Sequence, residues 1–124
     1  MIKPVTQPGP VELSVPLSVV KAELFKAMAS PARVRVLELL AEGERSVGEM
    51  QPFVGLEQSH LSQQLGVLRR AGLVVSRKEG SQVFYAVKNE LVVDLLSVAK
   101  RLLLSSLAET NEMLADLSGE LGSA

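Results

Sequence analysis

The sequence predicts a mainly α-helical domain with one small β-hairpin, and three features support this fold class. Apolar residues recur at helical spacing before residue 72. Two short runs of β-branched and aromatic residues follow, separated by a turn that contains glycine. A long apolar helical stretch then closes the chain. The 124 residues, with 47% hydrophobic side chains, are enough for one globular domain.

The first part of the chain contains strong helix-boundary signals. Residues 1–14 are rich in proline, which predicts a flexible arm, and a first helix is expected over 15–29. A second helix is expected over 31–42, because Ser30 can cap it and Pro31 fits its first position.

Two more helices are predicted next. Ser46 can cap a third helix that runs from 47 to about 53, and Pro52 predicts that this helix is short or irregular at its end. A fourth helix is expected over 58–71, since leucines recur along one side of it at the spacing of a buried stripe. The stripe consists of Leu61, Leu65 and Leu68.

The hydrophobic period changes after residue 72. The runs 73–77 and 83–87 predict a β-hairpin, with Gly80 in its turn. Asn89 can then cap a long helix that continues to about Leu117.

These elements define the expected domain organisation. A single domain spans 15–118, ends with the long helix, and is followed by a frayed tail over 119–124.

The order of elements is the plan of a winged helix-turn-helix domain. In that plan the fourth helix enters the major groove of DNA, which is wide enough for one helix. Its exposed side is rich in amides and hydroxyls that can pair with base edges, although such residues also form ordinary solvated faces. These residues are Gln58, Ser59, His60, Ser62, Gln63 and Gln64, and Arg69 and Arg70 end the helix.

Charge is unevenly distributed along the chain. The net charge of −1 excludes a uniformly basic coat, but residues 57–82 carry four basic and two acidic side chains. Residues 102–124 carry four acidic side chains and no basic one. Arg33 and Arg35 of the second helix are each interpreted either as phosphate contacts or as solvated side chains.

The residue composition excludes several kinds of chemistry. With no cysteine and one histidine, the chain cannot form a disulfide, a thiolate zinc site or a multi-histidine metal site by itself. It has no glycine-rich phosphate loop and no paired carboxylates that suggest acid–base catalysis. We therefore expect no enzyme activity, no cofactor and no metal site. Charged residues interrupt the most apolar stretch, 91–107, so we expect no membrane span and a cytoplasmic protein.

Three runs of sequence resemble the ArsR/SmtB family of bacterial repressors. They are LFKAMASPARVRVLELL at 24–40, QSHLSQQLGVLRRAGLV at 58–74 and RKEGSQVFY at 77–85. The resemblance covers roughly residues 17–107. It implies a homodimer, formed by the first and last helices, that binds an inverted-repeat operator on double-stranded DNA and represses transcription. It also implies base contacts from Gln58, Ser59, Ser62 and Gln63.

Two sets of candidate site residues follow. The expected DNA-binding residues are Gln58, Ser59, His60, Ser62, Gln63, Arg69, Arg77, Lys78 and Gln82. The leucine surface of the last helix is too wide for a small domain to cover alone, so we expect a dimer interface there. The expected interface residues are Leu17, Val20, Leu24, Leu91, Leu95, Val98, Leu102 and Leu103.

The chain departs from the family at the positions that bind metals. Leucine cannot ligate a metal, so we expect the switch to be a protein partner, a small apolar effector or control of abundance. Two alternatives stay open: a weak nickel- or zinc-responsive regulator that uses carboxylates and His60, and a winged-helix protein-interaction module that has lost DNA binding. The family's third-helix thiolate position falls on Ser46, and its last-helix ligand positions fall on Asn89, Leu91, Leu102 and Ser105.

A smaller departure lies at the start of the fourth helix. The family usually caps this helix with Ser or Thr, whereas the residue here is Glu57, which predicts a weaker cap.

Overall fold

The computed structural model describes residues 14–122, so most of the predicted N-terminal arm lies outside the described residues. The fold class predicted from the sequence is confirmed: the chain is mostly helical, with a small antiparallel sheet of strand order β1-β3-β2. The elements are α1 (Leu17–Met28), α2 (Pro31–Ala41), β1 (Arg45–Ser46), α3 (Val47–Val54), α4 (Gln58–Arg70), β2 (Val74–Glu79), β3 (Gln82–Val87) and α5 (Glu90–Gly122).

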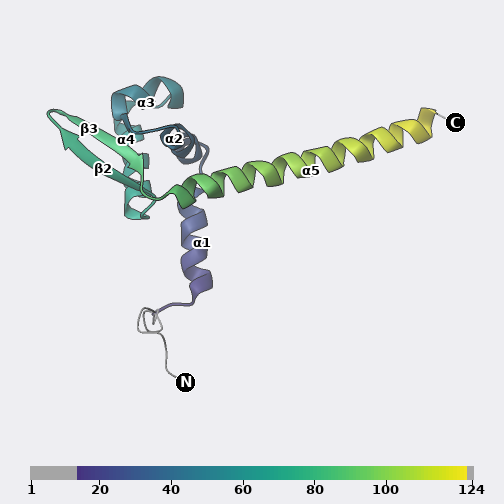
Figure 1. Cartoon of the computed structure of the whole chain (residues 1–124), viewed down its shortest axis with the longest axis horizontal. Helices are drawn as coiled ribbons and strands as arrows, with labels where there is room; N and C mark the ends of the chain where they lie inside the picture. Colours follow the sequence, from purple (N-terminus) through teal and green to yellow (C-terminus); the bar gives the residue numbers. More distant parts are fainter. Residues whose placement is uncertain (1–13, 123–124) are drawn as a thin grey trace.

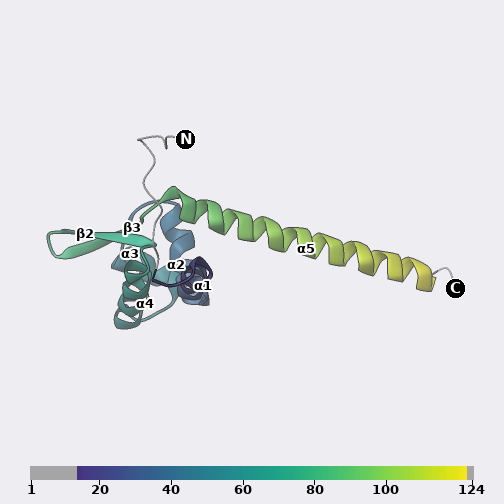
Figure 2. The ribbon, with the colours of Figure 1, turned by 90° about the horizontal axis from the view of Figure 1, so that it is seen from below.

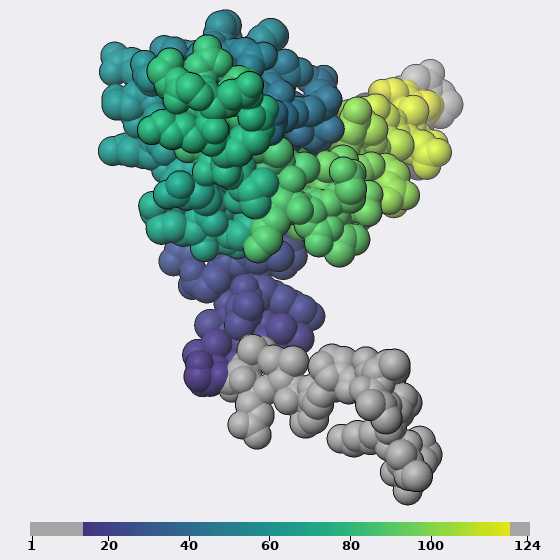
Figure 3. All heavy atoms as spheres, turned by 60° about the vertical axis from the view of Figure 1, so that its left-hand side comes forward, coloured from purple at the N-terminus to yellow at the C-terminus, as the bar shows by residue number. Residues whose placement is uncertain are grey.

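The molecule has a small body and two projecting helices. Helices α2, α3 and α4 gather beside the sheet, and β2 and β3 extend away from them as a hairpin (Figure 1). Helix α5 leaves this body and its C-terminal half points into open space in both ribbon views (Figures 1 and 2). Helix α1 also stands out from the body (Figure 3).

One apolar core holds the body together. The leucine stripe predicted for the fourth helix is fully buried, with Leu61, Leu65 and Leu68 each 0% exposed. Helices α2 and α3 cover this stripe with their own buried residues, chiefly Val36, Leu37, Leu40 and Met50. Each such buried side chain supplies roughly 1.5–3 kcal/mol before entropy is subtracted.

The three predicted helix caps are confirmed. Ser30 Oγ accepts a hydrogen bond from the Arg33 amide at 3.4 Å, and Asn89 Oδ1 accepts one from the Leu91 amide at 2.9 Å. Ser46 forms a reciprocal capping box with Glu49, as described next.

The capping box fixes the start of α3. Ser46 Oγ accepts from the Glu49 amide at 3.2 Å, and Glu49 Oε1 accepts from the Ser46 amide at 3.0 Å. The hydrogen bond from the Ser46 amide lowers the pKa of Glu49 below its ordinary value. A carboxylate with a lowered folded pKa stabilises the fold above its unfolded pKa, and loses this effect as the pH falls through the folded value.

Helix α3 is short, with 8 residues, which is one of the two outcomes that Pro52 predicted. Its end is regular: the helix continues to Val54 and stops at Gly55, which has a φ of 72°. In so short a helix, Pro52 removes only one internal hydrogen bond, and the capping box stabilises the first turn.

The sheet also differs from the sequence prediction. The hairpin strands are longer than expected, because Glu79 pairs with Gln82 and leaves only Gly80 and Ser81 in the turn. Strand β1 was not predicted, since two residues carry no alternating pattern. It pairs with β3, where Arg45 lies opposite Tyr85.

Helix α5 is longer than we expected. The helix continues through Gly119 to Gly122, so the tail predicted over 119–124 is helical as far as residue 122. One exposed glycine costs a helix only about 1 kcal/mol relative to alanine, which is too little to end it. Residues 123–124 lie outside the described part of the chain.

The capping box generates a stability prediction. Ser46→Ala removes a buried hydroxyl cap, and the free energy of unfolding should fall by about 1 kcal/mol. Chemical denaturation with urea measures this change. Ser105→Ala, at an exposed position inside α5, is the matched control and should change stability by less than about 0.5 kcal/mol. Equal effects of the two substitutions would contradict the role assigned to Ser46.

Candidate nucleic-acid interface

Helix α4 presents a continuous polar face to solvent. Its leucine stripe points into the core, so the residues on the other side are held outward by the same packing. The structure therefore brings most of the predicted DNA-binding residues together on one exposed surface. These residues are Gln58, Ser59, His60, Ser62, Gln63 and Arg69.

Gln64 lies apart from this polar face. It is half-buried, and its Oε1 accepts a hydrogen bond from Arg33 Nη1 at 2.8 Å. Its amide is therefore used inside the domain, although the sequence grouped it with the exposed residues of the same helix.

Arg33 clamps three helices together. Its Nε donates to the Ala27 carbonyl at 2.6 Å and its Nη2 to the Lys26 carbonyl at 3.3 Å. Both carbonyls belong to the last turn of α1, where carbonyl groups lack partners within the helix. Through its third bond, to Gln64, Arg33 joins α1 to α4 from its own position on α2. The structure thus favours an internal role for Arg33, whereas Arg35 is exposed.

The two cations of the wing have different surroundings. Arg77 donates to Glu44 at 2.6 and 2.8 Å and to Glu79 at 2.6 Å, and its guanidinium lies 4.7 Å from the centroid of the Phe84 ring. Lys78 is exposed, and as the next residue in the strand its side chain leaves from the opposite face.

These ion pairs change the local charge of the wing. The hydrogen bond from Arg77 lowers the pKa of Glu44, and its carboxylate partners raise the pKa of Arg77. Two carboxylates offset the charge of Arg77, so Lys78 is the better candidate for a free cation near DNA. The sequence missed this difference because Glu44 lies 33 residues away along the chain.

The tip of the wing and the start of α4 complete the candidate interface. Gln82 begins β3 beside the turn and is exposed. Glu57 precedes α4 and makes no side-chain cap hydrogen bond, which agrees with the weaker cap predicted there.

The predicted dimer residues form an exposed apolar surface in the single chain. Leu102 is 65% exposed and Leu103 is 70% exposed, whereas Leu95 and Leu24 are half-buried, and Leu24 packs against the core. The other predicted residues, Leu17, Val20, Leu91 and Val98, are exposed.

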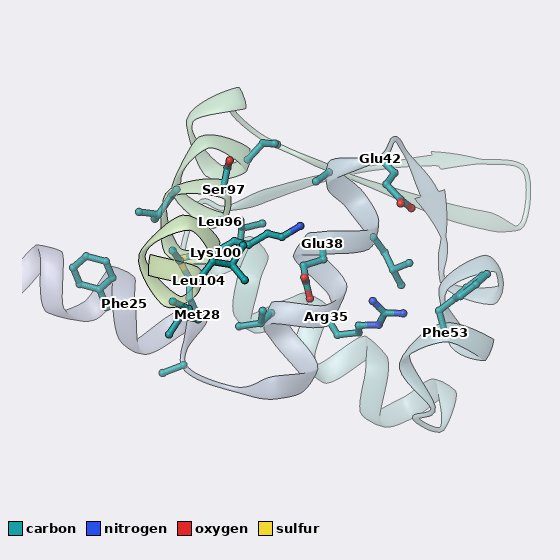
Figure 4. Close-up of a pocket in the computed structure, with 18 residues that line it drawn as sticks. Phe25, Met28, Arg35, Glu38, Glu42, Phe53, Leu96, Ser97, Lys100 and Leu104 are labelled. Atoms are coloured by element: carbon teal, nitrogen blue, oxygen red, sulfur yellow. The ribbon is translucent and has the colours of Figure 1, made fainter. Parts of the chain in front are cut away.

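A groove of about 1060 Å³ adjoins this surface. It lies between α5 and the helices α1 and α2, with Leu96, Lys100 and Leu104 of α5 facing Met28 and Glu38 (Figure 4). The apolar lining of this groove continues the exposed leucine surface of α5.

Within the part of the chain that the structure describes, no three His, Asp or Glu side chains lie close enough together to hold a metal ion. No helix in the described part of the chain is both long and apolar enough to cross a membrane.

A polar recognition helix beside an antiparallel hairpin defines a winged helix-turn-helix transcriptional regulator. Comparison with known proteins supports this class. Residues 30–76 match the family model described as "Bacterial regulatory protein, arsR family". The chain is 50% identical over 105 residues to the uncharacterised HTH-type transcriptional regulator Rv0081 of Mycobacterium tuberculosis. The aligned residues are 84% of this chain and 92% of that protein.

Other relatives are named for their effects on transcription. The biofilm growth-associated repressor of Agrobacterium fabrum is 45% identical over 75 residues, which are 60% of this chain and 64% of that protein. The transcriptional activator HlyU of Vibrio cholerae is 44% identical over 79 residues, which are 64% of this chain and 73% of that protein.

Solved structures show the same fold. The crystal structure of Rv0081 matches with a TM-score of 0.72 and 52% identity, covering 77% of this chain and 97% of that chain. The homodimeric winged helix-turn-helix DNA-binding domain of Mb0332 from Mycobacterium bovis matches with a TM-score of 0.69 and 31% identity, covering 75% of this chain and 86% of that chain. This chain therefore belongs to the ArsR family of bacterial regulatory proteins.

The Arg33 clamp generates a prediction. Arg33→Lys keeps the charge but cannot reproduce the planar set of donors that reaches two carbonyls and Gln64. The free energy of unfolding should fall by about 1–3 kcal/mol, as measured by urea denaturation. Arg35→Lys, on the exposed side of the same helix, should be nearly neutral. If both substitutions had the same effect, the clamp would not be needed for stability.

Proposed function

We propose that the protein binds an inverted-repeat operator on double-stranded DNA as a homodimer and represses transcription. The observation that carries the proposal is the polar face of α4, which the buried leucine stripe holds outward beside an exposed hairpin. A helix with such a face fits the major groove, where amides and hydroxyls can read base edges.

The residues of the interface have distinct proposed roles. Gln58, Ser59, Ser62 and Gln63 read bases, because their exposed side chains both donate and accept hydrogen bonds. His60 and Arg69 lie on the same surface and contact bases or phosphates. Lys78 and Gln82 place the wing on the DNA backbone.

Arg77 has a second proposed role at the wing. Its bonds to Glu44 and Glu79 position the hairpin, and one of these carboxylates would have to release it before it bound phosphate.

The proposed homodimer forms through α1 and α5. Exposed leucines on α5 make a surface that a monomer would leave in contact with water. The homodimeric domain of Mb0332, which shares this fold, supports the proposal.

Repression is proposed as the direction of control. The resemblance to bacterial repressors and the name of the Agrobacterium relative support it, and the name of the Vibrio relative makes activation the outcome to test against. We further propose that the effector is a protein partner or a small apolar molecule. A cytoplasmic location and the lack of enzyme activity, cofactor and metal site stay predictions.

Base reading and phosphate binding can be separated experimentally. Gln63→Ala should weaken binding to the operator by about 1–3 kcal/mol and leave binding to random DNA almost unchanged, because base contacts carry the specificity. Lys78→Ala should weaken binding to both DNAs and reduce the salt slope by about one unit. Footprinting on DNA from upstream of the protein's own gene identifies the operator. Gel shifts with that operator and with random DNA, across a series of salt concentrations, then measure both effects.

The control for these variants is Lys88→Ala, since Lys88 is an exposed lysine outside the proposed interface. It should leave both affinities unchanged. Equal losses on operator and random DNA for Gln63→Ala would refute its proposed role. If the wild-type protein bound no upstream site more tightly than random DNA, the proposed function would be wrong. A winged-helix protein-interaction module that has lost DNA binding would then replace it.

The proposed dimer predicts a strong effect of one charge on α5. Leu102→Asp places a carboxylate without a partner in an interface that excludes water, so the dimer should dissociate. Light scattering at micromolar concentration measures the mass. Ser81→Asp, in the exposed turn of the wing, is the control and should remain dimeric. A wild-type protein that scattered as a monomer would disprove the homodimer.

A further inference from the structure

One arginine side chain crosses the middle strand of the small sheet. The strand order is β1-β3-β2, so β3 lies between Arg77 on β2 and Glu44, the residue that precedes β1. Arg77 nevertheless donates to Glu44 twice, from Nε to Oε2 at 2.8 Å and from Nη2 to Oε1 at 2.6 Å. Its guanidinium lies 4.7 Å from the ring centroid of Phe84, the residue of β3 that pairs with Arg77. The side chain therefore passes over β3 and ties the hairpin to the segment before β1.

The guanidinium of Arg77 is already fully occupied by carboxylates. Its third nitrogen, Nη1, donates to Glu79 Oε2 at 2.6 Å, so each of the three nitrogens has a carboxylate partner. Arginine binds phosphate through the same planar pair of donors that Glu44 occupies here. The Phe84 ring adds a favourable cation–π contact to the bound geometry. A DNA phosphate that approached Arg77 would therefore have to displace a carboxylate, and it would offer no better geometry.

The occupied arginine changes what the wing can contribute to DNA affinity. That affinity depends on how many phosphates are neutralised by cations, because each neutralised phosphate releases counterions. Arg77 has two anionic partners, so this part of the wing is net negative and Arg77 has no free charge to offer. Lys78 is exposed and forms no ion pair with any residue that the structure describes. Two adjacent cations of β2 thus differ in their availability to phosphate.

We propose that Glu44 is a positioning residue that withholds Arg77 from the DNA backbone. Glu79 assists by holding the third nitrogen, and Lys78 is left as the cation of β2 that meets phosphate. This inference rests on the proposed DNA-binding function and adds to it a carboxylate that sets how strongly the wing holds any duplex. Loss of both carboxylates frees Arg77 to neutralise one more phosphate, while the hairpin loses its tie to the segment before β1.

The salt dependence of binding tests the proposal, because it counts phosphate contacts. Glu44→Gln with Glu79→Gln removes both anions and keeps the size of the side chains. On a random-sequence duplex, the slope of log affinity against log salt should steepen by about 0.9 for each protomer bound. The affinity lost between about 50 and 200 mM salt should therefore be about 3.5-fold larger for each protomer. Fluorescence anisotropy with a labelled duplex measures both quantities.

Arg77→Ala separates the release of the arginine from the loss of negative charge. Added to the Glu44→Gln/Glu79→Gln variant, it should return the slope to the wild-type value, and in the wild type it should change the slope far less. The charge-matched control is Glu38→Gln with Glu90→Gln, since both carboxylates are exposed and neither pairs with a described residue. This control should keep the wild-type slope. Exposed ion pairs contribute little to stability, so all variants should fold, which circular dichroism checks.

The outcomes distinguish this inference from the proposed function. A wild-type slope in the folded Glu44→Gln/Glu79→Gln variant overturns the inference alone. A steeper slope that persists after Arg77→Ala is added, or that the control variant also shows, assigns the change to lost negative charge and overturns the inference too. A wild-type protein that binds neither random DNA nor any upstream site overturns both the inference and the proposed function.

Discussion

Burial of the leucine face of α4 is the constraint on which the rest of the structure depends. Leu61, Leu65 and Leu68 lie at a spacing that places them on one side of the helix, and all three are excluded from solvent. Their burial decides which side chains remain outside, so one packing arrangement stabilises the body and orients the polar face. A substitution in this stripe would therefore disturb stability and the interface together, because the same helix serves both.

Sequence periodicity was enough to predict the parts of the fold that depend on local rules. A helix cap needs only a side-chain oxygen two or three residues before a free backbone N–H group. The structure confirms the caps predicted at Ser30, Ser46 and Asn89. Strand β1 could not be predicted, because two residues have no period and its pairing partner lies far along the chain. The continuation of α5 past Gly119 was also missed, since one glycine is a weak stop signal.

The candidate interface was harder to predict, because exposure on a helix surface depends on distant partners. Gln64 has the same chemistry as Gln63 and differs only in facing Arg33, which lies 31 residues earlier. Arg77 and Lys78 are adjacent cations in the sequence, yet alternation along β2 sends them to opposite faces, and Glu44 holds only Arg77. A count of charges over a segment cannot distinguish a free cation from one already paired by a distant residue.

Arg33 connects α1, part of the proposed dimer interface, to the helix proposed to read DNA. The same guanidinium holds the last turn of α1 and the Gln64 side chain of α4, so these helices cannot move apart without losing hydrogen bonds. Packing of α1 in the proposed dimer would favour the spacing of α1 and α4 that this clamp already holds. By thermodynamic linkage, DNA binding and dimerisation would then strengthen each other. The gain in free energy is the same in both directions. An effector that displaced α1 from the dimer would therefore weaken both interactions at once, without the need for a metal site.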